Sequence, residues 1–91
     1  MIQLHLVVSG RVQGVGFRYF AHKLANEFAV NGWVKNSPNG DVEIMVTGEK
    51  DVLDSFIEKL KKGNRFAKVK HIAIHPREEI EPFSSFQIKH Y

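Results

Sequence analysis

The spacing of apolar residues switches along the chain between two and three or four, and this switching limits the fold more than any other feature. Over residues 3–9 the apolar side chains Leu4, Leu6 and Val8 fall on one face, which predicts a half-buried strand. A stripe with spacings of three and four follows, at Phe17, Phe20, Ala21, Leu24, Ala25 and Phe28. This stripe predicts a helix that ends near Ala29, where we expect a left-handed backbone because a new strand begins within three residues.

After the first helix, the spacing of apolar residues returns to two and then to three or four. Residues 32–36 and 41–47 are predicted strands, joined through a segment whose Asn39-Gly40 pair is a strong hairpin signal. A second helical stripe follows, at Val52, Leu53, Phe56, Ile57 and Leu60. It is stopped by Gly63, which stands in the position of a left-handed cap.

Two more strands are expected near the end of the chain. The first runs from about Lys68 to His75, with a bulge or a late start because Val69 and Ile72 break the alternation. An acidic surface loop covers residues 76–82, and residues 84–90 form the last strand. The order predicts one α+β domain over residues 1–91. We expect a ferredoxin-like split βαβ sandwich, with a short C-terminal strand and an antiparallel sheet that carries both helices on one face.

A glycine-rich loop links the first strand to the first helix. Gly10, Gly14 and Gly16 precede Arg18, which falls in the first turn of the predicted helix. Free backbone N–H groups at a helix start point at any bound anion, so the loop predicts a phosphate-sized site. It lacks the third glycine of a dinucleotide fingerprint and the Gly-Lys-Ser/Thr ending of a Walker loop.

The predicted topology brings a second polar residue to this loop. In a split βαβ sheet the first two strands run parallel with the third between them, so the loop after Ser9 and the end of the second strand emerge at the same edge. Two strand intervals separate them by roughly 10 Å. Asn36 ends the second strand and is therefore expected near the loop.

Composition narrows the function classes. The chain has no cysteine, which excludes a disulfide scaffold and a thiol nucleophile, and it has no long apolar run. We therefore expect a cytoplasmic protein without a membrane segment. Its formal net charge of +3 favours anionic partners.

The five histidines do not predict a metal site. His71 and His75 share a strand face but lie about 13 Å apart at ~3.3 Å per residue, too far to bind one ion. No Glu-containing helical motif accompanies any histidine. We expect solvated histidines and neither a metal nor a cofactor.

Two segments of the chain resemble the two signature segments of the acylphosphatases. The first runs from Val8 to Arg18. The second runs from Gly32 to Val42, and Gly48 closes the hairpin arm that follows it. The resemblance covers essentially the whole chain. It implies a metal-independent hydrolase that cleaves the carboxyl-phosphate anhydride of small acyl phosphates to carboxylate and inorganic phosphate. We also expect inorganic phosphate to inhibit as an occupant of the same loop, the protein to be a monomer, and no specific nucleic acid to be bound.

By position, the resemblance implies roles for individual residues. Arg18 is similar to the family's substrate-binding arginine, and Asn36 to the asparagine that orients the attacking water. The amides of Gly14, Val15, Gly16, Phe17 and Arg18 resemble the family's phosphate cradle. Asn64 departs from the family's usual proline and Ala29 from its usual glycine, and both departures concern backbone geometry rather than chemistry.

Each role has a simpler alternative. Arg18 could be an ordinary exposed arginine. A cation in the first turn of a helix is, however, unfavourable by ~0.3 to 1 kcal/mol because it faces the positive end of the dipole, unless an anion binds both the cation and the amides there. Asn36 could be a turn former.

Two other functions stay open. An RNA-recognition domain shares this layout, but the strand over residues 41–47 has no aromatic residue on which a base could stack. A catalytically silent anion sensor would need only the loop.

Overall fold

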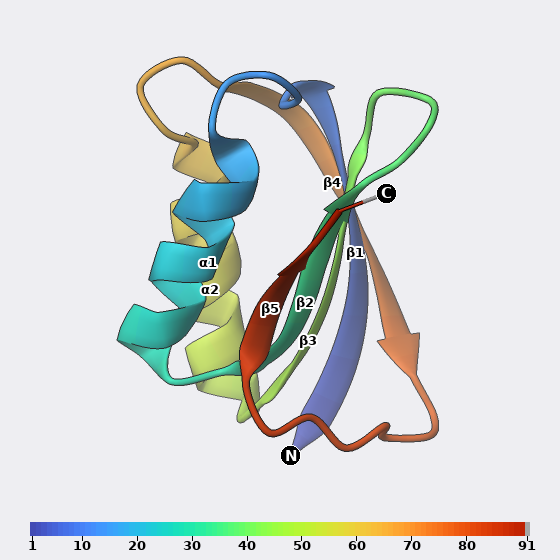
Figure 1. The fold of residues 1–91 in the computed structure, drawn as a ribbon. Helices are drawn as coiled ribbons and strands as arrows, with labels where there is room; N and C mark the ends of the chain where they lie inside the picture. The colour runs from blue at the N-terminus through green and yellow to red at the C-terminus, as the bar shows by residue number, and fades with distance from the viewer. Residues whose placement is uncertain (91) are drawn as a thin grey trace.

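Seven elements follow one another in the computed structural model, which describes residues 1–90 (Figure 1). The strands are β1 (Ile2–Arg11), β2 (Asn31–Asn36), β3 (Val42–Gly48), β4 (Lys68–Arg77) and β5 (Phe86–Lys89). The helices are α1 (Phe17–Phe28) and α2 (Lys50–Lys62). The predicted order is confirmed, while Tyr91, the last residue of the expected domain, lies outside the described residues.

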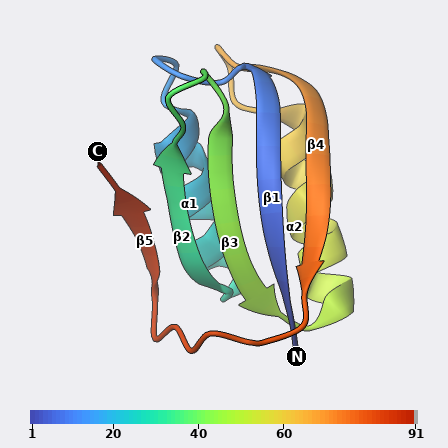
Figure 2. The same ribbon diagram turned by 90° about the vertical axis from the view of Figure 1, so that its right-hand side faces the viewer.

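The five strands form one sheet in the order β4-β1-β3-β2-β5, with both helices on one face (Figure 2). β3 pairs antiparallel with β1 and with β2, so β1 and β2 run parallel on either side of it, as the split βαβ arrangement requires. One edge differs from the expected antiparallel sheet, because β5 pairs parallel with β2. The chain crosses from β4 at one edge to β5 at the other and enters β5 in the direction of β2 (Figure 2).

The core fills the space between the sheet and the helices. Leu6, Val8, Val34, Ile44 and Val46 point inward from the strands and are fully buried, as the alternation predicts. The helices add Phe17, Ala21, Leu24, Ala25, Leu53, Phe56, Ile57 and Leu60. No helix within residues 1–90 covers the other face of the sheet, which we call the open face (Figure 2).

The last two strands differ from prediction in their lengths. β4 begins at Lys68 as expected but continues to Arg77, so Pro76 belongs to the strand and not to the loop. Proline is tolerated there because β4 is an edge strand that needs no ladder bond on its outer side. β5 is shorter than expected and begins at Phe86.

The predicted irregularity near Val69 is a bulge. Ser9 pairs with His71 and Gly10 with Val69, which leaves Lys70 as the extra residue. Gly10 has φ 123°, and a Cβ there would lie 2.2 Å from the carbonyl oxygen of Lys68. The bulge lies where β1 ends, so it directs the chain into the glycine loop.

The two helices end differently. Ala29 has φ 55° and ψ 42°, which confirms the predicted left-handed backbone. Gly63 has φ 69° but ψ 179°, so the expected left-handed cap after α2 is wrong, although the positive φ is present. The extended ψ carries the chain away from α2 into the segment that begins at Asn64.

Candidate active site

Two buried side chains anchor the glycine loop to the core. Val12 and Phe17 are each 1% exposed, so the backbone between them must arch over the surface. Gly14 and Gly16 have φ of 73° and 76°, a left-handed conformation that L side chains rarely adopt. Gly16 is also the N-cap of α1 and makes no side-chain capping bond. The first amides of α1 are therefore left to other partners.

The loop encloses a small cavity of about 120 Å³. This space is large enough for a few water molecules or one small anion. Its lining residues are Val12, Gly14, Gly16, Phe17, Arg18, Tyr19 and Asn36. The predicted approach of Asn36 to the loop is thus present in the fold.

One residue of the predicted cradle, Val15, does not line the cavity. Its side chain packs against the core, and its carbonyl oxygen accepts a hydrogen bond from Asn64 at 2.7 Å. Its peptide plane still forms part of the loop.

Arg18 is held at the cavity by the end of the chain. Its Nη1 donates to the carbonyl oxygen of Lys89 at 3.2 Å and lies 3.2 Å from His90 Nδ1. Within residues 1–90 these contacts use only Nη1, so the other two guanidinium nitrogens, Nη2 and Nε, can donate to a ligand. The parallel position of β5, which sequence patterns did not predict, brings Lys89 here.

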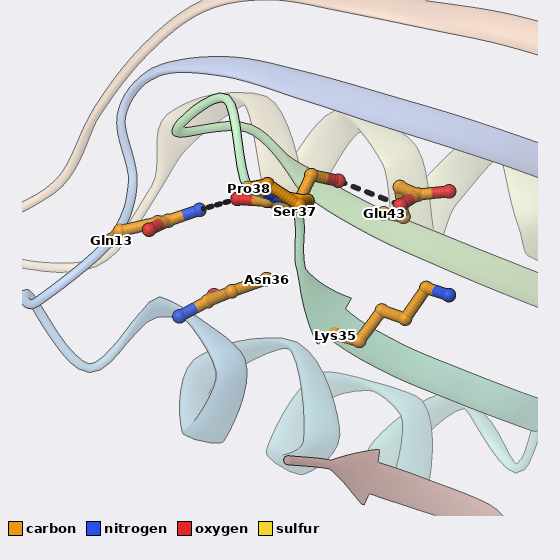
Figure 3. Close-up of a pocket in the computed structure, with 6 residues that line it drawn as sticks. All are labelled: Gln13, Lys35, Asn36, Ser37, Pro38 and Glu43. Atoms are coloured by element: carbon orange, nitrogen blue, oxygen red, sulfur yellow. Dashed lines mark hydrogen bonds between the residues drawn. The ribbon is translucent and has the colours of Figure 1, made fainter. Parts of the chain in front are cut away.

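Asn36 carries the most informative atom of the site. Its Oδ1 is buried and finds no hydrogen-bond donor among residues 1–90. An unsatisfied buried acceptor costs about 1–3 kcal/mol, so it needs an explanation. Figure 3 shows the Asn36 side chain extending toward the loop that precedes α1, while Lys35 extends the other way along the sheet.

Gln13 ties the loop to the hairpin that carries Asn36, a role that the sequence analysis missed. Its Nε2 donates to the carbonyl oxygens of Ser37 at 2.8 Å and Asp41 at 2.7 Å. Figure 3 shows the first of these bonds. Gln13 lies inside the first signature segment, which was the only available signal, because no periodicity rule predicts a contact across 24 residues.

A short chain of polar contacts supports the same hairpin from the open face of the sheet. Ser37 Oγ donates to Glu43 at 2.6 Å, and Glu43 lies 3.1 Å from His5 Nε2. The Ser37 hydrogen bond is the main reason that the pKa of Glu43 lies below its ordinary value, so this carboxylate is ionised at neutral pH. The expectation that all histidines are solvated is wrong for His5, which is half-buried and packs 6.0 Å from the His75 ring.

A larger hollow of about 720 Å³ adjoins the loop cavity. Its lining residues are Gln13, Lys35, Asn36, Ser37, Pro38 and Glu43 (Figure 3). Asn36 lines both hollows.

Comparisons with known proteins identify the family. The acylphosphatase family model matches residues 4–88. The chain belongs to the acylphosphatase family. It is 43% identical to the acylphosphatase of Bacillus subtilis (strain 168), over 97% of each chain. The enzyme is thus a hydrolase with acylphosphatase activity, and acyl phosphates are its substrate class.

Solved structures of the family have the same fold. The crystal structure of acylphosphatase from Bacillus subtilis superposes with a TM-score of 0.95 at 42% identity, covering 99% of this chain and 100% of that one. The acylphosphatase from Coxiella burnetii gives a TM-score of 0.91 at 38% identity, covering 97% and 92%. The ferredoxin-like acylphosphatase fold is therefore confirmed.

Two further observations concern the part of the chain that the structure describes. No three His, Cys, Asp or Glu side chains within residues 1–90 come together as ligands for one metal ion. Neither helix combines the length and hydrophobicity that crossing a bilayer requires.

Proposed function

We propose that this acylphosphatase works without a metal, with the phosphate group held by Arg18 and the amides of residues 14–18 and the attacking water positioned by Asn36. The observation that carries the proposal is that Asn36 lines the cavity together with Arg18, and that its buried Oδ1 has no hydrogen-bond donor among residues 1–90. A water molecule bound to the Asn36 amide would lie beside the phosphate group.

The start of α1 supplies the phosphate-binding groups. The amides of its first turn are free of intrahelical partners and carry the positive end of the helix dipole. No side chain caps them at Gly16. The Arg18 guanidinium adds a planar fork that can bind two phosphate oxygens at once, so amides and arginine share one anion.

The reaction is a displacement at phosphorus. The water oxygen bonds to phosphorus while the bond to the acyl oxygen breaks, and the carboxylate leaves with the electron pair on the side opposite the water. A phosphate oxygen accepts the proton of the water. Asn36 accepts a hydrogen bond from the water without taking its proton, so it acts by orientation. Water reaches Asn36 through the larger hollow.

The partner of the site is a small acyl phosphate, with inorganic phosphate as product and competitive inhibitor and the enzyme acting as a monomer. The open face of the sheet gives little support to the nucleic-acid alternative. Its Trp33 ring is covered by two lysines of the same chain, with Lys35 Nζ at 5.1 Å and Lys89 Nζ at 4.8 Å from the ring centroid. A base would have to displace these lysines before it could stack.

The decisive experiment measures phosphate release from an aryl acyl phosphate in excess EDTA, for the wild type and for Asn36→Ala. We expect turnover in EDTA, and a fall in kcat of about a hundredfold in the variant with the inhibition constant of phosphate changed only a few-fold. A requirement for added metal would refute the metal-free reaction, and no turnover at all would favour the silent anion sensor.

Asn39→Ala is the matched control, because Asn39 is an exposed asparagine in the same hairpin, and within residues 1–90 its side chain bonds only to Asp41 in its own turn. Its activity per folded molecule should stay near that of the wild type. If Asn36→Ala loses phosphate binding as much as turnover, then Asn36 is a phosphate ligand and the proposed water contact is wrong.

A further inference from the structure

A side chain from the far end of α2 holds the phosphate loop by its backbone. Asn64 Nδ2 donates to the Val15 carbonyl oxygen at 2.7 Å, across 49 residues of sequence. The same amide accepts, through Oδ1, a hydrogen bond from the Ala67 N–H at 3.0 Å. Both ends of the Asn64 amide are therefore engaged, and its orientation is fixed by two different groups.

The contact with Val15 fixes the orientation of the whole Val15–Gly16 peptide bond, in addition to that of the Val15 carbonyl oxygen. The peptide bond between Val15 and Gly16 is trans, because the described chain contains no cis peptide. In a planar trans peptide the C=O and N–H bonds point in opposite directions. Because Asn64 binds the Val15 oxygen, the Gly16 N–H must point away from Asn64.

The Val15–Gly16 peptide could rotate easily without the hydrogen bond from Asn64. Gly16 has φ 76° and ψ 17°, and glycine crosses between positive and negative φ at little cost, so its preceding peptide could turn over. A turned peptide would present a carbonyl oxygen where the loop otherwise presents an N–H. Next to an anion, that exchange replaces an attraction with a repulsion.

We propose that Asn64 is a positioning residue for phosphate binding, which locks the Val15–Gly16 peptide so that the Gly16 N–H faces the anion. This inference rests on the proposed function, because it assigns the Gly16 amide to the phosphate cradle. Gly16 lines the loop cavity together with Arg18 and Asn36. Asn64 itself does not line that cavity.

The first test is the inhibition constant of inorganic phosphate for the wild type and for Asn64→Ala, measured per folded molecule. Loss of one well-aligned amide bond to an anion should raise this constant and KM about tenfold, with a smaller change in kcat. This pattern is the reverse of the one expected for Asn36→Ala. In a 15N-labelled sample, the Gly16 amide signal should shift on phosphate addition in the wild type and shift far less in the variant.

Asn64→Asp separates the two bonds of the side chain. The aspartate keeps the acceptor for the Ala67 N–H and the size of the residue but loses the donor for the Val15 oxygen. Because it also adds a negative charge, Arg65→Ala is the matched control. That variant makes the same change in net charge at the next residue, an exposed side chain whose ring contact is with Phe66. Phosphate binding should weaken clearly more in Asn64→Asp than in Arg65→Ala.

The outcomes separate this inference from the proposed function. If wild-type enzyme does not bind phosphate at the loop, the proposed function fails first. If the wild type binds phosphate and both Asn64 variants bind it equally well, the peptide lock is wrong. A lower melting temperature with an unchanged inhibition constant would make Asn64 a structural contact only, and it would also overturn the inference. Should Asn64→Ala fail to fold, the comparison of Asn64→Asp with Arg65→Ala decides.

Discussion

The two helices of this protein differ in where their charged residues lie relative to the helix dipole. α2 has Asp51 in its first turn and Lys59, Lys61 and Lys62 in its last, where the dipole favours these charges, and its one unfavourably placed cation, Lys50, is paired with Asp54. α1 has no acidic residue in its first turn and no basic residue in its last, within a helix that the structure describes completely, and it carries Arg18 at its positive end. α2 is stabilised by charges of its own sequence, whereas the start of α1 is where the proposed function has the phosphate bind.

The same contrast appears in how the helices are held. α2 adds an exposed ion pair along its surface, between Lys50 and Asp54 at 2.9 Å. The start of α1 is instead held by distant segments, since Arg18 contacts the chain at Lys89 and the preceding loop is bound through Gln13 and Asn64. Both helices begin without a side-chain cap, so the restraint by distant segments is what distinguishes the start of α1.

The largest expected effect is that of Arg18→Lys. The change keeps the positive charge but loses the planar fork, so kcat/KM should fall by about 10² to 10³ while the protein stays folded. Steady-state kinetics with an aryl acyl phosphate, together with a thermal melt, measures both. If a lysine at this position supports wild-type kcat/KM, the bidentate contact is wrong and α1 needs only a charge.

The second prediction tests whether a bound anion at the start of α1 stabilises the fold. Inorganic phosphate at a hundred times its dissociation constant should stabilise the fold by about 2.7 kcal/mol, because it binds only the native state. Thermal melts at constant ionic strength, with chloride in place of phosphate as the control, measure the shift. Arg18→Lys should reduce it. An equal stabilisation by chloride would mean that the start of α1 has no specific anion site.

The third prediction concerns the other end of α1. Ala29 has a left-handed backbone that costs a residue with a Cβ roughly 1 kcal/mol, so Ala29→Gly should stabilise by about 1 kcal/mol or less after the gain in unfolded-chain entropy. Urea unfolding gives the difference. Activity should not change, because Ala29 lies at the end of the helix away from the loop. A loss of stability would mean that the left-handed strain at this residue is negligible.

The smallest effect belongs to α2. Asp51→Asn removes the acidic residue from its first turn and should cost about 0.3 to 1 kcal/mol at low salt, an effect that added salt reduces. The free energy of unfolding at two salt concentrations tests this, with kcat/KM expected to stay at the wild-type value. If Asp51→Asn slowed the enzyme as Arg18 variants do, the functional contrast between the two helices would disappear.

The fold was largely predictable because its information is local. The alternation of Leu4, Leu6 and Val8 and the helical stripes fixed which faces are buried, and the order of the elements then implied that Asn36 ends beside the glycine loop. Even the strain at Ala29 followed from the short distance between a helix and the next strand. Each of these inferences depends only on periodicity and chain connectivity.

The tertiary structure decided what lies beyond the reach of periodicity. The parallel pairing of β5 with β2, the contact of Arg18 with the end of the chain, and the ties from Gln13 and Asn64 to the loop join residues between 24 and 72 positions apart. A polar side chain on a loop has no repeating pattern, and its partner is set by how the elements dock. The sequence therefore predicted that Asn36 and Arg18 meet at the glycine loop, and only the packed structure showed which other residues hold that loop in shape.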